Sequence, residues 1–163
     1  MLDLVSAAAV SLALQAAPAG AVDPLSAVGI VSVCAEARKA EDSAATMQAS
    51  GLSPDTLTFP DGSTSDERPG EVYTAEWSDT LLVIITPPIR EGGQKTCLIY
   101  ANVSGENMSP LVTRMNKSFG PVTTSEQGAQ WRNGNDLITM KAVGRLEDEG
   151  RRLSISVTEI GDQ

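Results

Sequence analysis

Two cysteines, Cys34 and Cys97, could react in a chain of 163 residues that contains no histidine. A catalytic thiol needs a base, typically histidine, to hold it as the thiolate. Zinc needs about four ligands, which two lone cysteines do not supply. Lipid attachment to Cys34 is disfavoured because Val33 is bulkier than the small residue expected there, and because Cys97 would stay unpaired. A structural disulfide is therefore predicted, with two buried reduced thiols in a cytosolic chain as the alternative.

Acid–base catalysis would fall to carboxylates, because the commonest general base is missing. Exposed carboxylates at strand ends are usually solvated charges. The sequence also lacks G-x-S-x-G, S-x-x-K and glycine-rich phosphate-binding motifs, and residues 61–72 do not match a calcium loop. We therefore expect no catalytic residue, no bound metal and no cofactor. The carboxylates considered, all expected near strand ends, are Glu71, Glu76, Asp79 and Asp136.

Aromatic side chains are the remaining candidates for recognition. Four of them would provide contact points for a protein partner, or stacking surfaces for a sugar, if they lay on an open sheet face. The competing interpretation places the two tryptophans at equivalent core positions beneath the helices. Exposure of either tryptophan would favour a binding function. The four candidates are Trp77, Trp131, Tyr73 and Tyr100.

The chain is acidic, with 21 carboxylate residues against 12 Lys and Arg residues and a formal net charge of −9. Its largest cationic cluster is Arg151-Arg152. A phosphate backbone or an anionic membrane surface would be repelled by such a chain. We therefore expect no nucleic-acid partner and no stable membrane association after signal cleavage.

The first residues have the pattern of a secretory signal peptide. An apolar run over residues 4–14 precedes the helix-breaking Pro18 and a small-residue cleavage motif at 19–21. We expect residues 1–21 to be cleaved off, leaving a single α+β domain over residues 22–163 in the periplasm or outside the cell. The basic residues that normally open a signal are missing, so a start further upstream stays open. The alternatives are a membrane anchor and a buried N-terminal helix.

Two helices are expected from apolar residues at helical spacing. The first covers residues 24–50, has Asp23 as its N-cap and carries Cys34 on its inward side. The second covers residues 110–119, with Ser109 as its N-cap and a proline in its first turn. Residues 51–71 are expected to be a loop.

In both halves of the chain a helix precedes three apolar segments with strand character. This order predicts an α+β fold, an antiparallel sheet with helices packed on one face, built from two tandem helix-plus-three-strand units. It resembles in outline the tandem helix–sheet repeats of secreted inhibitor proteins such as the β-lactamase inhibitory protein, an analogy of element order without a supporting motif. The strands are expected over residues 72–77, 80–86, 95–103, 128–134, 136–147 and 151–160.

These observations predict an exported, non-enzymatic small globular domain. We expect a protein-binding or inhibitor-like module, with an unknown partner, that acts through its sheet face or through the loop at residues 51–71. The alternative is a carrier that encloses a small apolar ligand between sheet and helices. An enzyme that uses carboxylates is a third possibility.

The signal peptide gives a first testable expectation. N-terminal sequencing of the exported protein should begin at or near Val22, because the small-residue motif directly before it is the expected cleavage site. A mature chain that still begins at Leu2 would contradict cleavage.

Overall fold

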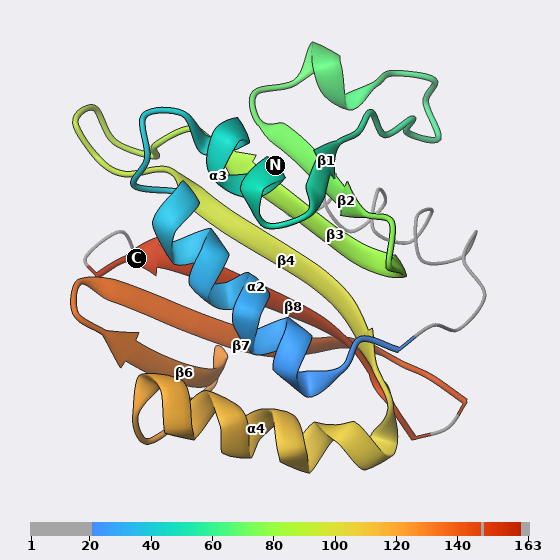
Figure 1. Cartoon of the computed structure of the whole chain (residues 1–163), viewed down its shortest axis with the longest axis vertical. Coiled ribbons are helices and arrows are strands. Elements are labelled where there is room, and N and C mark those ends of the chain that lie inside the picture. The colour runs from blue at the N-terminus through green and yellow to red at the C-terminus, as the bar shows by residue number, and fades with distance from the viewer. Residues whose placement is uncertain (1–20, 148, 161–163) are drawn as a thin grey trace.

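The computed structural model describes residues 21–147 and 149–160, so the predicted signal segment lies almost entirely outside the described residues (Figure 1). The helices are α2 (Pro24–Ala37), α3 (Ser43–Ala49) and α4 (Gly105–Phe119), and a short 3-10 turn is η1 (Ser65–Glu67). The strands are β1 (Leu52–Pro54), β2 (Glu71–Ala75), β3 (Ser78–Thr86), β4 (Thr96–Val103), β5 (Thr123–Ser125), β6 (Gly128–Asn133), β7 (Asp136–Arg145) and β8 (Arg151–Glu159).

These strands form one antiparallel sheet in the order β1-β2-β3-β4-β8-β7-β6-β5. Helices α2 and α4 lie side by side on one face of it, as Figure 1 shows. The predicted α+β class, an antiparallel sheet with helices, is confirmed. None of the helices within the described part of the chain is both long and apolar enough to span a bilayer.

The two halves of the chain contribute equivalent parts of the sheet. In each half helical structure is followed by four consecutive antiparallel strands, β1 to β4 and β5 to β8, and the halves meet where β4 pairs with β8. The prediction of one helix and three strands per unit therefore missed one edge strand in each half. Strands β1 and β5 have three residues each, which is too short for a recognisable alternating pattern.

Strand register gives the correspondence between the halves. Tyr73 lies opposite Val83 in the first half, and Trp131 lies opposite Ile138 in the second. Both aromatic rings are buried in the core beneath the helices, so Tyr73 is the counterpart of Trp131. Trp77 instead lies in the turn between β2 and β3 and is 50% exposed. The expectation that the two tryptophans occupy equivalent core positions is therefore wrong.

Helix α2 begins where the sequence predicts, with the Asp23 side chain accepting a hydrogen bond from the Leu25 amide. It does not continue to residue 50. The chain leaves the helix at Arg38, whose side chain turns into the core, and a new helix begins after Asp42, which caps α3 through the Ala45 amide. This break coincides with the burial of a charged side chain. The periodic pattern of the sequence does not predict that burial.

Helix α4 begins about one turn earlier than expected, at Gly105, with Ser104 at the N-cap position. Pro110 therefore lies inside the helix rather than in its first turn. The missing proline N–H removes one hydrogen bond near the helix start. An inward stripe of Leu111, Met115 and Phe119 packs into the core and compensates for that loss.

The main core lies between the helices and the sheet, and a disulfide crosses it. Cys34 on α2 is bonded to Cys97 on β4, as the sequence predicts; their Cα atoms are 5.7 Å apart and both residues are fully buried. The bond ties the first helix to a central strand across 63 residues of sequence. It packs among apolar neighbours that include Val31 and Ile99.

Removal of the disulfide should destabilise the protein strongly. Cys34→Ser and Cys97→Ser should each lower the free energy of unfolding by about 4 kcal/mol, because the unfolded chain regains the entropy of a long loop. Urea unfolding under oxidising conditions measures the loss, and the double variant should lose about as much as either single variant. Parent-like stability of both single variants would contradict a structural role for the bond.

Candidate functional site

Asp136, one of the carboxylates considered for catalysis, is part of a buried ionic cluster. Arg38 Nη2 donates to Asp136 Oδ1, and Lys39 Nζ lies 2.7 Å from Oδ2. The side chains of Arg38 and Asp136 are 0% and 2% exposed, whereas that of Lys39 is 42% exposed. Both carboxylate oxygens are occupied by cations. The cluster therefore ties the end of α2 to the start of β7, and its geometry fits a structural role rather than a free general base.

The other three carboxylates lie in the first half of the sheet, apart from Asp136. Glu71 on β2 accepts a hydrogen bond of 2.5 Å from the Tyr73 hydroxyl, and Glu76 and Asp79 are exposed around the β2–β3 turn. Burial, reinforced by the hydrogen bond to Glu71, raises the pKa of Tyr73 above its ordinary value. Among the described residues there is no group of three or more Cys, Asp or Glu that could hold a metal ion.

The four aromatic candidates do not form one site. Trp131 is fully buried, and its indole Nε1 donates to Asn116 Oδ1 on α4 at 2.8 Å. Tyr73 lies in the same helix-side core, and Trp77 is exposed at a hairpin turn. Tyr100 belongs to a smaller apolar cluster that excludes the helices. Of these four candidates, Tyr100 and Trp77 therefore lie outside the main core.

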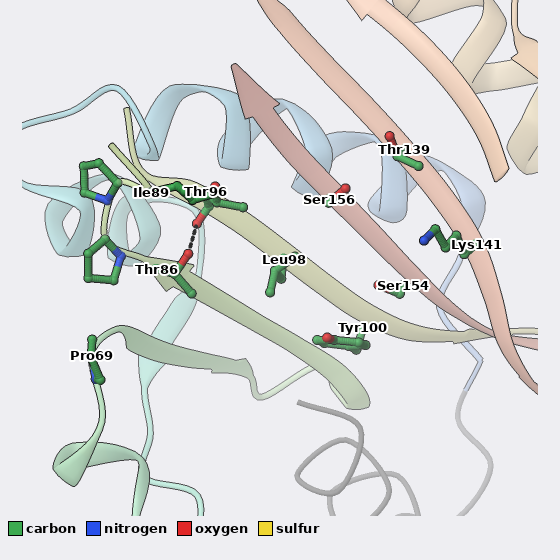
Figure 2. Close-up of a pocket in the computed structure, with 12 residues that line it drawn as sticks. Pro69, Thr86, Ile89, Thr96, Leu98, Tyr100, Thr139, Lys141, Ser154 and Ser156 are labelled. Carbon is green, nitrogen blue, oxygen red and sulfur yellow. Dashed lines mark hydrogen bonds between the residues drawn. The ribbon is translucent and has the colours of Figure 1, made fainter. Parts of the chain in front are cut away.

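The sheet face opposite α2 and α4, here called the open face, carries a hollow of about 610 Å³. Cys97 and Ile99 on β4 point into the main core, so Leu98 and Tyr100 point to the open face. Figure 2 shows these two side chains and those of β7 and β8 on the side of the sheet away from the helices. The hollow is lined by Leu98, Tyr100, Thr139, Lys141, Ser154, Ser156, Thr86, Thr96, Pro69, Pro87, Pro88 and Ile89.

Strand register arranges the floor of the hollow in two rows across the sheet. Each row begins with apolar or aromatic side chains in the first half of the chain and continues in the second half with polar side chains, which are three hydroxyl groups and one lysine. Leu57 packs over the apolar end. The rows are Leu82, Tyr100, Ser154 and Lys141, and Ile84, Leu98, Ser156 and Thr139.

Most of this hollow was missed by reasoning from sequence. The alternation of Leu153, Ile155 and Val157 with hydroxyl residues does place Ser154 and Ser156 on a face away from the core. Nothing local indicates that β8 lies beside β4. Only the pairing of these two strands in the tertiary structure brings the hydroxyl groups of the second half next to the apolar residues of the first half.

A second hollow, of about 570 Å³, lies between the start of α4 and the β7–β8 hairpin. Arg145 and Arg151 line it together with Glu147 and Glu149, and the last two are exposed carboxylates. Charges of both signs meet there, so this hollow has no clear preference for a charged ligand.

Comparison with known proteins adds no assignment to this geometry. No protein-family model, curated protein or solved structure matches the chain.

Breaking the buried ionic cluster should reduce stability unequally. Asp136→Ala should lower the free energy of unfolding by about 3 kcal/mol or more, because the Arg38 charge would stay buried without its partner. Lys39→Ala should cost less than about 1 kcal/mol, since the Lys39 ammonium is partly solvated. Denaturant unfolding of both variants measures the contrast. Similar losses for the two would contradict the structural role assigned to the Arg38–Asp136 pair.

Proposed function

We propose that the protein is an exported, non-enzymatic module that binds a partner protein through the open face of its sheet. One observation carries the proposal: the helices cover a single face, and the other face holds a surface hollow of about 610 Å³ with mixed apolar and hydroxyl lining. A sheet fixed from behind by packed helices and a disulfide presents that surface without a large ordering cost.

The composition of the hollow suits a protein partner. Pro87, Pro88 and Ile89 follow β3 and stand exposed at the rim, with Ile89 at 68% exposure. Leu98 and Tyr100 supply an apolar and aromatic floor, and hydroxyl groups of β7 and β8 lie beside it. Protein interfaces of the non-obligate kind likewise combine apolar and aromatic contacts with polar groups.

Export is supported by two features. Residues 1–21 have the pattern of a cleaved signal peptide. The buried disulfide between α2 and β4 fits an oxidising compartment, because cytosolic reductants keep most thiols reduced. Both features favour the periplasm or the extracellular space as the place of action.

The alternative of a carrier for a small apolar ligand has less support. The space between the helices and the sheet, where such a ligand was expected, contains the packed side chains of the main core. The open-face hollow lies at the surface and is partly lined by serine and threonine hydroxyls, which an apolar ligand would leave unpaired. A polypeptide can satisfy those hydroxyls with its own polar groups.

A capture experiment tests the open face directly. The wild-type protein, Ser156→Arg and Thr113→Arg are immobilised and exposed to an envelope extract, and captured proteins are identified by mass spectrometry. Ser156 lies on the floor of the hollow, whereas Thr113 is exposed on α4, so the two variants carry the same added charge on different faces. We expect wild type and Thr113→Arg to capture the same protein, and Ser156→Arg to bind it at least about tenfold more weakly.

Thermal unfolding of each variant verifies that the fold is retained. Calorimetric titration of the purified partner then gives the affinities. Equal binding by Ser156→Arg and the wild type would show that the open face is not the interface.

A further inference from the structure

The open face differs in charge from the rest of this acidic chain. In β3 from Leu82 onward, and in β4, β8 and β7, register and alternation identify the residues that point away from the helices. Two of these residues are cations and none is a carboxylate, although the whole chain has 21 acidic and 12 basic residues. The set is Leu82, Ile84, Thr86, Thr96, Leu98, Tyr100, Asn102, Leu137, Thr139, Lys141, Gly144, Arg152, Ser154, Ser156 and Thr158.

The carboxylates of β7 and β8 lie on the helix side, and β4 contains none. Asp136 pairs with Arg38 in the core, and Glu159 lies opposite Asp136 in the β7–β8 register. Asp79 is exposed at the start of β3, in the stretch where the register shifts between the pairs Thr74–Leu82 and Ala75–Ser78, so alternation assigns it to neither face. The separation of charge between the two faces therefore follows from strand alternation.

The cations lie on the part of the open face that the second half of the chain forms. Lys141 is exposed, lines the hollow and lies opposite Ser154. Arg152 occupies the next outward position on β8, and its Nε is buried without a hydrogen-bond partner. Neither forms an ion pair with a residue that the structure describes. On the neighbouring strand β6, Arg132 is exposed and alternates with the inward Trp131.

We infer that the open face selects an acidic segment of its partner protein, with apolar side chains over Leu98 and Tyr100 and a carboxylate directed at Lys141 and Arg152. This inference rests on the proposed function, because it specifies the partner of the same face. A carboxylate there meets two cations that form no ion pair within the described residues, and β4, β7 and β8 have no carboxylate at their outward positions. A lysine or arginine would meet like charges. Such complementarity acts mainly on partner choice and association rate.

Selection from a display library of random peptides tests this charge preference without a known partner. The library is panned in parallel against wild type, Lys141→Glu and Lys117→Glu. Lys117 is exposed on α4, so the two variants have the same net charge and differ only in the face that is altered. Peptides enriched by wild type and by Lys117→Glu should contain an excess of Asp and Glu over the input library. Lys141→Glu should lose that excess and bind the wild-type peptides roughly tenfold more weakly.

The possible outcomes separate this inference from the proposed function. Enriched peptides that compete with the captured partner but show no excess of acidic residues would overturn the charge preference and leave the open face as the interface. Equal loss of acidic peptides by Lys117→Glu would also overturn it, since the effect would then come from net charge.

Self-association is measured in the same series by sedimentation. A dimer of the wild-type protein that Lys141→Glu dissociates would identify the occupant as a second copy of the chain. That result would overturn the acidic partner segment. A monomeric wild-type protein with acidic peptide selection supports it.

Discussion

The antiparallel pairing of β4 with β8 joins the two halves of the chain into one continuous sheet, and the open face depends on it. Each half alone is a four-stranded meander with exposed edges, which are prone to wrong pairing. The pairing places Leu98 opposite Ser156 and Tyr100 opposite Ser154. The apolar floor of the first half and the hydroxyl floor of the second half thereby become a single surface.

Helix α2 is attached to both halves through residues one turn apart. Cys34 is bonded to Cys97 on β4, and Arg38 pairs with Asp136 at the start of β7. The first contact is covalent and constrains the unfolded chain. The second is an ion pair inside the protein, and the cost of desolvating its two charges offsets much of their attraction. Together they fix α2 against one side of the sheet, and neither α2 nor α4 packs on the other side.

The two faces of the sheet have different chemistry because strand alternation separates side chains by type. On β8 the inward residues Leu153, Ile155 and Val157 are all buried in the core, and the outward residues between them are hydroxylic. On β3 and β4 apolar residues point both ways, so the first half needs the additional cover that Leu57 supplies. The open face is therefore apolar at one end and polar with cations at the other.

Local sequence patterns predicted the cap at Asp23, the buried strand β3 and the alternation of β8, and the even cysteine count without histidine predicted the disulfide. Tertiary structure alone decided the end of α2, since Arg38 is buried only because Asp136 meets it from the other half. It also brought Lys141 into one hollow with Tyr100. The periodicity of a segment indicates which of its own residues point to the same face. Which residues of different strands share that face depends on the pairing of strands that are distant in sequence.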